Sequence, residues 1–485
     1  MAQPSVHPLW SSLALDRDCG VSLQDQIAHY FRNAIADGRM RGGRRVASSR
    51  QLALDCGVSR TTAVEAYERL VEEGYFVTRR GAGVFVAATP PDKFRLAARN
   101  GHAAHGAAPG AQLQVATRLD ARHYHLPLAP GMPAIDRFPW STWARLTNQI
   151  CRERPLNAIG YGDPQGELAL RQTIAEYLAT ARGIRCSAGQ ILVMAGSEQS
   201  LEFMVRQVAE AGDAAWIEEP TGPWVRKLLL GAGVMPVPVE VDADGMAVAQ
   251  ALRKAPRARL AIVSPTHQYP TGATLSLARR EQLIDWCEST GGWILESEID
   301  GDYRYVPRPI APICALARVP RVFYCGSLSK PLAPGLRTNY LVVPESLMDN
   351  LALRPTLVPM LAQLVLARFN SAGHMAQHMR RMRTLYARRR AILLDALRTQ
   401  LADALDMPRV PEGGLRVTAE LRHGLDDVSI AERCLAAGIK VDPLSVCYTG
   451  EPRSGLIIGF ASTPEERIPA AVTTLATVIR RELDL

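Results

Sequence analysis

Long hydrophobic runs are missing from this sequence. Hydrophobic residues make up 47% of its 485 positions, yet none of its apolar stretches reaches the roughly 18 residues that span a bilayer. Its beginning, MAQPSVHPLWSSLALDRDCG, also lacks a basic region followed by an apolar core, so it does not have the pattern of a secretory signal. We therefore expect no membrane segment and a globular protein of the cytoplasm.

Paired cysteines are missing as well. The nine cysteines are scattered singly, with no CxxC pair and no zinc-site spacing, so we expect reduced structural thiols and no metal. The net charge of +8 is small for a chain of this length, and it indicates an anionic partner only where the positive charges gather. The length itself predicts about two or three domains.

The first 88 residues carry a compact set of local signals. Ser22 is a favourable N-cap, apolar residues follow at four-residue spacing, and Gly38 ends the pattern, which predicts one amphipathic helix. The segment SRQLALDCGVSRTTAVEAYERLVEEGY predicts two short helices, with Gly57 in the turn and Ser59 as the second N-cap. YFVTRRGAGVFVA then predicts a β-hairpin with a basic, glycine-rich tip. This order of elements is typical of a DNA-binding domain.

The residue types of this segment suit a DNA duplex. The helix after Ser59 begins with hydroxyls and a guanidinium, where backbone N–H groups and the helix dipole also favour phosphate. Arg60 could read guanine or grip the backbone, although each arginine taken alone could equally be a solvated surface charge. The other candidates for phosphate or minor-groove contacts are Arg50, Arg79, Arg80 and Gly81.

A different pattern begins after this segment. Residues 89–122 are rich in Ala, Gly, Pro, His and Gln without clear periodicity, which predicts a mostly flexible linker. Beyond them, helical stretches such as ELALRQTIAEYLATARG alternate with short β-branched or apolar runs, which predicts parallel strands in a wound α/β domain. These runs are QILVM, AAWIEEP, MPVPVEV, LAIVSP, GWILES and RVFYCGS. Ligands of such sheets gather beyond the carboxyl ends of the strands.

Both halves of the chain resemble known families. Residues 23–87, which include SSRQLALDCGVSRTTAVEAYERL, resemble the winged helix of GntR-family transcription regulators. YGDPQGELALRQTIAEYL, SPTHQYPTGATLSLARR and GSLSKPLAPGLRTNYLVVP resemble the aminotransferase-like, fold-type I pyridoxal phosphate (PLP) domain. The fusion of the two in this order resembles the MocR/GabR subfamily. This resemblance implies a winged-helix domain at 1–88, a linker at 89–122, and an α/β aminotransferase-like domain with a mostly parallel central sheet at 123–485.

The GntR resemblance implies DNA contacts at matching positions. One departure is Ala47, where the family usually has proline, so we expect a less rigid start to the helix that follows. The implied DNA contacts are Arg50, Ser59, Arg60, Thr61, Thr62, Arg80 and Gly81.

The PLP resemblance implies a cofactor site around Lys330. This lysine stands where the family forms its Schiff base, and Arg337 stands where a guanidinium binds the phosphate. Gly196 and Ser197, between a strand and a helix, would offer backbone N–H groups and a hydroxyl to the same phosphate. Tyr161 matches a tyrosine that reaches the phosphate from the partner subunit. The remaining implied cofactor contacts are Ser327, Ser329 and Tyr269.

Several family positions near the cofactor ring are changed. Ser297 stands where an aspartate meets the pyridine nitrogen, and Ile299 stands where a tyrosine donates to the phenolic oxygen. Glu298 is adjacent, but successive side chains of a strand face opposite sides, so it could replace the aspartate only through a bulge or a shift.

Other changes affect the stacking group and the recognition of a substrate. Glu198 replaces a glutamine beside the phosphate, and Gly222 replaces a tyrosine of the stacking motif, for which Trp224 is the candidate substitute. SGLIIGF offers no arginine at the C-terminal position with which some aminotransferases bind the substrate carboxylate, although Arg453 is near in sequence.

These changes favour sensing over turnover. Without an acid on the pyridine nitrogen the ring is a poor electron sink, whereas binding does not need that acid. The sequence therefore predicts a transcription regulator with a vestigial aminotransferase domain, which binds double-stranded operator DNA and senses PLP or its adduct with an amino acid or amine. Two alternatives stay open: a PLP-independent regulator with another ligand, and an active PLP-dependent aminotransferase with an accessory DNA-binding domain. The resemblance also implies a domain-swapped, head-to-tail homodimer.

Overall fold

The computed structural model describes residues 13, 15–17, 19–79, 81–88, 123–298, 301–305, 310–351, 356–407 and 410–483. The chain divides into two compact units, Met1–Val115 and Ala116–Leu485. The predicted linker at 89–122 lies outside the described residues. No helix of the described residues is long and apolar enough to cross a membrane.

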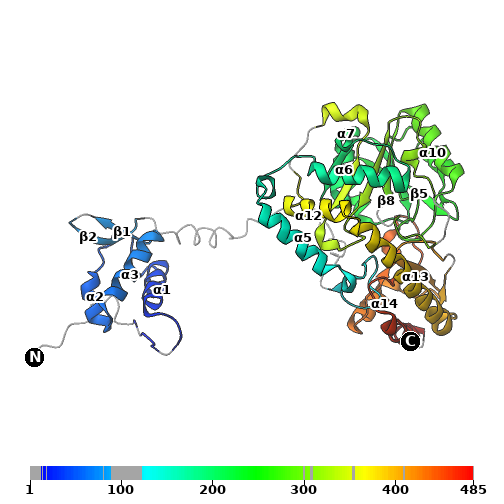
Figure 1. Ribbon diagram of the computed structural model, residues 1–485. Helices are drawn as coiled ribbons and strands as arrows, with labels where there is room; N and C mark the ends of the chain where they lie inside the picture. Colours follow the sequence, from blue (N-terminus) through cyan, green and yellow to red (C-terminus); the bar gives the residue numbers. More distant parts are fainter. Residues whose placement is uncertain are drawn as a thin grey trace, which may run out of the picture. The chain divides into compact units, whose positions relative to one another are not determined.

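The N-terminal unit is a winged helix (Figure 1). Its elements are α1 (Leu23–Ala36), α2 (Ser49–Cys56), α3 (Arg60–Glu72), β1 (Phe76–Arg79) and β2 (Gly83–Val86). The three predicted helices and the predicted hairpin are confirmed, and β1 pairs antiparallel with β2. Ser22, Ser48 and Ser59 each cap a helix by accepting a backbone N–H bond. Gly57 ends α2 with φ 64°, a left-handed conformation that favours glycine.

An aromatic cluster fixes the packing of this unit. Phe31 of α1, Tyr67 of α3 and Phe76 of β1 meet edge to face, with ring centroids 5.3–5.7 Å apart. Such pairs add about 0.5–1.5 kcal/mol each to the hydrophobic gain. Tyr67 also donates to the carbonyl of Ala47 at 3.1 Å. The turn before α2 is therefore held by this bond and by the Ser48 cap, at the position where the family has proline.

The larger unit is built on an eight-stranded sheet of the order β3-β10-β9-β8-β7-β4-β5-β6 among the described residues. Strands β5, β4, β7, β8 and β9 run parallel to one another, while β10 is antiparallel to β3 and β9, and β6 is antiparallel to β5. The strands are β3 (Ile191–Met194), β4 (Ala214–Glu219), β5 (Met235–Asp242), β6 (Gly245–Met246), β7 (Leu260–Val263), β8 (Trp293–Glu298), β9 (Val322–Ser327) and β10 (Asn339–Val342). The six predicted runs are strands, and the mostly parallel sheet is confirmed.

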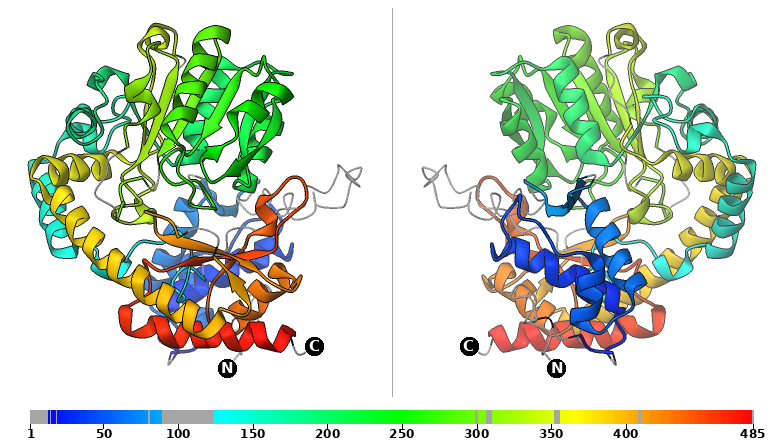
Figure 2. Two further views of the ribbon diagram at one scale, coloured as in Figure 1. Left: turned by 90° about the vertical axis from the view of Figure 1, so that its right-hand side faces the viewer. Right: turned by 90° about the vertical axis from the view of Figure 1, so that its left-hand side faces the viewer.

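Helices cover both faces of this sheet (Figures 1 and 2). Leu295 and Phe323 face α7 and α8, so we call their side the α7 face. The opposite side, which we call the α10 face, carries two clusters. Ile294 packs there with α9, α10 and α11, and Tyr324 packs there with α5, α6 and α12. The helices are α5 (Trp140–Glu153), α6 (Leu168–Tyr177), α7 (Ser197–Val208), α8 (Pro223–Gly231), α9 (Val248–Lys254), α10 (Leu277–Thr290), α11 (Ile313–Leu316) and α12 (Met360–Ser371).

A second, antiparallel sheet of the order β11-β12-β14-β13 forms near the C-terminus. Its strands are β11 (Leu405–Asp406), β12 (Arg416–Leu421), β13 (Asp442–Pro443) and β14 (Gly455–Gly459). It packs on α13 (His374–Leu401), α14 (Asp427–Ala436) and α15 (Ile468–Leu483), drawn in gold, orange and red in Figure 2. Two of these strands have only two residues, too short for a periodic pattern, so this sheet is not predictable from local sequence.

Candidate ligand pocket and DNA-binding surface

Lys330 lies in the loop between β9 and β10, beyond the end of β9. Its Nζ donates to the carbonyl oxygen of Gly131 at 2.8 Å. Gly131 has φ 69°, and a Cβ there would lie 3.1 Å from Nζ, so glycine leaves room for the lysine head. The sequence reasoning missed Gly131 because nothing in its local pattern marks a contact with a residue 199 positions away.

Two predicted serines hold this loop in shape. Ser329 Oγ accepts from the backbone N–H of Thr338 at 2.5 Å and donates to the Thr338 carbonyl at 3.2 Å. Ser327 Oγ accepts from the backbone N–H of Lys330 at 3.2 Å. Both side chains are buried. Their bonds within the loop position Lys330 and bring the two ends of the loop together.

Arg337 lies over the start of α7. It has φ 48°, and its Nη2 is 3.3 Å from the place of a Cβ on Gly196. Gly196 is the N-cap of α7, with φ 118°. With its amide oriented to satisfy its partners, Asn339 accepts from Ser197 N–H at 3.2 Å and donates to Ser327 Oγ. A guanidinium beside a helix N-terminus is an arrangement suited to a phosphate or carboxylate.

The end of β8 carries the positions that the resemblance assigns to the cofactor ring. Ser297 shares the α7 face of β8 with Leu295 and is half-buried. Strand β8 stays in regular register with β9 as far as the pair Glu298↔Gly326, so no bulge turns Glu298 toward Ser297. Glu298 is buried on the other side and accepts from the Thr266 N–H at 3.0 Å. Ile299 lies outside the described residues.

Buried carboxyl groups gather on the α10 face behind this strand end. Glu218 of β4 is 4% exposed and accepts from the Ser264 N–H at 3.2 Å. Burial, with the neighbouring Glu298 as a smaller cause, raises the pKa of Glu218 to about 8. Burial also raises the pKa of Glu298. Burial thus shifts both acids toward their neutral forms, and both lie on the side of the sheet opposite to Ser297.

The Trp224 side chain lies beside Gly222, the position where the family has its stacking tyrosine. A Cβ on Gly222 would lie 2.7 Å from the indole Nε1 of Trp224. Trp224 packs against the apolar cluster of the α7 face, as Phe203 and Leu228 also do. The indole therefore occupies the space that a side chain at 222 would need.

The two predicted tyrosines lie in contrasting surroundings. Tyr269 is half-buried, and the guanidinium carbon of Arg416 is 4.6 Å from its ring centroid. Tyr161 is 88% exposed, and nearby Leu156 and Ile159 are 82% and 87% exposed. Exposed apolar side chains in one short segment are typical of a surface that a partner covers.

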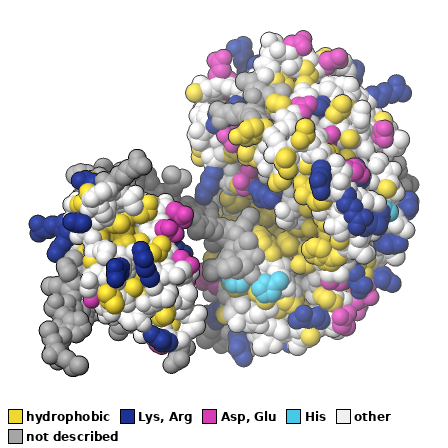
Figure 3. All heavy atoms as spheres, turned by 60° about the vertical axis from the view of Figure 1, so that its left-hand side comes forward, with side chains coloured by type: hydrophobic (Ala, Val, Ile, Leu, Met, Phe, Trp, Pro, Cys, Tyr) yellow, Lys and Arg dark blue, Asp and Glu magenta, His cyan; other side chains and the backbone are white. Residues whose placement is uncertain are grey.

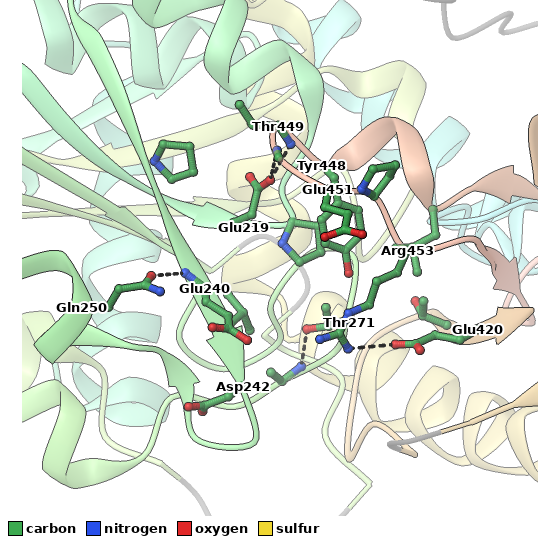
Figure 4. A pocket seen from close by; sticks show the side chains of 18 of the residues that line it. Glu219, Glu240, Asp242, Gln250, Thr271, Glu420, Tyr448, Thr449, Glu451 and Arg453 are labelled. Carbon is green, nitrogen blue, oxygen red and sulfur yellow. Dashed lines mark hydrogen bonds and ion pairs between the residues drawn. The ribbon is translucent and has the colours of Figure 1, made fainter. Parts of the chain in front are cut away.

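A cavity of about 950 Å³ opens between the end of β4, strand β5 and the C-terminal sheet (Figure 4). Glu219 Oε1 accepts there from the Gly450 N–H at 2.9 Å, and Arg453 Nη1 is 3.4 Å from Glu420 Oε1. Thr418 and Glu420 bring β12 into its wall. The sequence reasoning missed this cavity, because the segments that line it are distant along the chain.

The winged-helix unit presents its predicted DNA contacts at α2, α3 and the hairpin. Arg50, Ser59, Arg60 and Thr61 are exposed, and Thr62 is half-buried. Ser59 Oγ accepts from the Thr62 N–H at 3.0 Å, so it caps α3. The exposed Gly81 has φ 74° at the tip of the hairpin, while Arg80 lies outside the described residues. Figure 3 shows arginine side chains on the surface of this unit, whose described residues include no lysine.

Comparisons with known proteins match both units. Residues 23–86 match the gntR family of bacterial regulatory proteins, and residues 141–475 match aminotransferase class I and II. The chain is 33% identical to the probable rhizopine catabolism regulatory protein MocR of Rhizobium meliloti, covering 96% of this chain and 95% of that protein. It is 30% identical to the pyridoxine biosynthesis transcriptional regulator PdxR of Corynebacterium glutamicum, covering 94% and 96%.

The larger unit also resembles solved aminotransferases. LysN, the α-aminoadipate aminotransferase of Thermus thermophilus complexed with N-(5'-phosphopyridoxyl)-L-leucine, aligns with a TM-score of 0.67 at 25% identity over 74% of this chain and 93% of that one. The fold and both matches define a helix-turn-helix transcription regulator. More narrowly, the chain belongs to the MocR-type regulators, in which a GntR-type winged helix is joined to a class I and II aminotransferase-like domain.

Proposed function

We propose that this regulator binds PLP, or a PLP adduct of an amino acid or amine, in the pocket of Lys330 and Arg337, and that this binding controls its hold on operator DNA without efficient transamination. The observation that carries the proposal is the contrast within one pocket. One loop carries both Lys330 and Arg337, and Arg337 lies beside the start of α7, while Ser297 stands where an acid would be needed.

The anion-binding part fits the phosphate of PLP. Arg337 and the α7 N-terminus would hold the phosphate by charge and by N–H groups, with the Ser197 hydroxyl beside them. The Lys330 amine is placed by the loop that Ser327 and Ser329 stabilise. When bound, PLP supplies an aldehyde that condenses with primary amines. The relative PdxR is named for pyridoxine biosynthesis, which supports a B6 compound as the ligand.

The ring end does not favour catalysis. Ser297 offers a hydroxyl where a carboxylate would keep the pyridine nitrogen protonated, and Glu298 faces away. An unprotonated ring withdraws electrons poorly, so proton removal from a bound amino acid would lose stabilisation. The contacts that hold the phosphate and the amine do not depend on this acid.

The DNA side of the proposal rests on α3 and the hairpin. Arg50, Arg60 and Thr61 are exposed at and before the α3 N-terminus, where they can contact phosphates or base edges. Exposed Leu156, Ile159 and Tyr161 support a homodimer, in which two winged helices would read two half-sites. Ligand binding controls DNA binding if it favours one arrangement of the two units over another. Such a regulator would work in the cytoplasm.

Absorbance spectra of the full-length protein with PLP, before and after borohydride, test the cofactor assignment. We expect a band of bound cofactor that borohydride fixes to the wild-type protein and not to Lys330→Ala. No band in the wild type would contradict the proposal. A ligand response that Lys330→Ala leaves unchanged would favour the PLP-independent regulator. Sustained turnover of amino donors without operator binding would favour the aminotransferase.

A further inference from the structure

The C-terminal sheet turns one face toward the loop of residues 268–272. Val417 and Ala419 of β12 and Ile458 of β14 face the C-terminal core. Arg416 and Thr418 alternate with them, so they face the other way. Thr418 Oγ1 donates to the Pro270 carbonyl at 2.6 Å, which places this second face against the loop of residues 268–272.

Arg416 is a buried cation on this second face of the C-terminal sheet. It is 3% exposed, and its guanidinium carbon lies 4.6 Å from the centroid of the Tyr269 ring. In register, Arg416 is opposite Gly459, and Thr418 is opposite Ile457. Ile457 packs with Leu444, Cys447 and Tyr269. The second face thus has an apolar residue on β14 and a guanidinium on the neighbouring strand.

Backbone contacts connect this face to Lys330. Gly459 donates to the Leu128 carbonyl at 2.8 Å, and a Cβ on Gly459 would lie 2.0 Å from the Ala129 carbonyl oxygen. Two residues further, the Gly131 carbonyl accepts from Lys330 Nζ. The strand position opposite Arg416 therefore abuts the segment that contacts the lysine amine.

The cavity of Figure 4 extends along the same face of β12. Thr418 and Glu420, two and four residues beyond Arg416, belong to its wall, together with Thr271 of the loop that carries Tyr269. This cavity begins two residues beyond Arg416 along β12, so a side chain that extends from a ligand at Arg416 would have room along the strand. A guanidinium held over an aromatic ring keeps a fixed plane, which suits the bidentate recognition of a carboxylate.

We infer that Arg416 binds the carboxylate of the effector, so the effector is an amino acid rather than a simple amine. The inference rests on the proposed function, because it requires a ligand whose amine is held beside Lys330. Arg416 would supply from β12 the anion contact that Ile457 on β14 does not supply.

A pair of stable compounds tests this inference. N-(5'-phosphopyridoxyl)-L-alanine and N-(5'-phosphopyridoxyl)ethylamine differ only in the carboxylate, and calorimetry on PLP-free, full-length protein measures binding without any reaction. We expect the wild type to bind the carboxylated compound roughly 10- to 100-fold more tightly. Arg416→Gln should abolish this preference, and Arg416→Lys, which keeps the charge and loses the fork, should retain part of it.

Arg453→Gln is the matched control, since Arg453 lies in the same part of the chain and 3.4 Å from Glu420. It should leave the preference intact. A preference that survives in Arg416→Lys and Arg416→Gln, or that disappears in Arg453→Gln instead, would overturn the inference while leaving the proposed function in place. Failure of the wild type to bind either compound would overturn both.

Discussion

The two ends of the ligand pocket keep different amounts of the aminotransferase chemistry. At the lysine end, one loop carries Lys330 and Arg337, Arg337 lies beside the start of α7, and buried serines hold the loop in shape. At the proposed ring end, Ser297 stands where the family resemblance implies an acid. In the proposed site, the groups that would hold a phosphorylated aldehyde and the group that would make its ring reactive lie on separate segments. One set can be kept when the other is lost.

Carboxyl groups are present near the ring end, but the sheet turns them away. Glu296 and Glu298 share the α10 face of β8, and Glu296 accepts from the N–H groups of Ile313 and Cys314 at 2.8 Å. Burial raises the pKa of Glu296 to about 7. The ring end therefore lacks an acid for two reasons: the residue on the α7 face is a serine, and the neighbouring glutamates point to the opposite face.

The largest expected effect tests whether the acids on the α10 face are neutral. Glu218, with its pKa raised to about 8 in the fold, keeps its proton when the unfolded chain has lost it. Stability is then fully present below the ordinary glutamate pKa and falls as the pH rises toward 8, by about 5 kcal/mol at most. Melting temperatures from pH 5 to pH 8 should fall less in Glu218→Gln than in the wild type.

The exposed Glu210→Gln is the control for this experiment and should follow the wild type. Glu296 and Glu298 would preserve part of the fall in Glu218→Gln, since burial raises their pKa values too. Identical slopes in the wild type and in Glu218→Gln would show that Glu218 is ionised in the fold. The ring end would then have a negative charge behind it, and the contrast between the two ends would be weaker.

Removing the Arg337 guanidinium should weaken PLP binding at the lysine end. Arg337→Ala leaves the α7 N-terminus without its guanidinium, and the loss of charge-assisted hydrogen bonds should weaken PLP binding by roughly 10- to 100-fold. Absorbance titration with PLP measures the change. Arg206→Ala, at the other end of α7, should not alter the affinity. An unchanged affinity in Arg337→Ala would remove the phosphate from this position.

An acid placed at position 297 should make the bound cofactor more reactive. Ser297→Asp places a carboxylate on the α7 face of β8, where it can hold a ring nitrogen protonated, so the half-reaction with L-alanine should accelerate roughly tenfold or more. Stopped-flow absorbance follows the bound cofactor. Ser297→Asn, which has the same shape and no charge, should stay at the wild-type rate. Equal rates in both variants would mean that the missing acid is not what limits turnover.

Much of the fold could be predicted because its signals are local. Ser22, Ser59 and Gly57 mark helix ends within a few residues of sequence, and the structure confirms these ends. The runs around β4 and β8 are apolar because both faces of a central strand are covered. Strand β10 and the C-terminal sheet carried weaker signals, since short strands take their pairing from distant partners.

The site divides in the same way. Lys330, Arg337 and Gly196 belong to motifs that are readable in sequence. Gly131 accepts from Lys330, and Asn339 links the loop to α7. Neither contact is readable in sequence, because the order of the strands in the sheet creates it and the spacing of residues along the chain does not. Arg416, the proposed carboxylate contact, lies on the C-terminal sheet, whose strands the sequence did not predict.

The smallest expected effect concerns the stacking group between the two ends. If the Trp224 indole stacks on the ligand ring in place of a residue at 222, then Trp224→Leu should weaken binding of N-(5'-phosphopyridoxyl)-L-alanine by roughly three- to tenfold, since aromatic pairs contribute about 0.5–1.5 kcal/mol. Leucine keeps an apolar side chain against the cluster of the α7 face. Calorimetry gives the affinity, and the melting temperature shows whether the packing survives.

A second substitution separates stacking from packing. Gly222→Tyr alone should destabilise the protein and leave the affinity low, because its Cβ would lie 2.7 Å from Trp224 Nε1. In the Trp224→Leu background the same tyrosine has space and should recover most of the lost affinity, so the two changes are strongly non-additive. An affinity that Trp224→Leu does not change, with additive effects in the double variant, would confine Trp224 to the core of the α7 face.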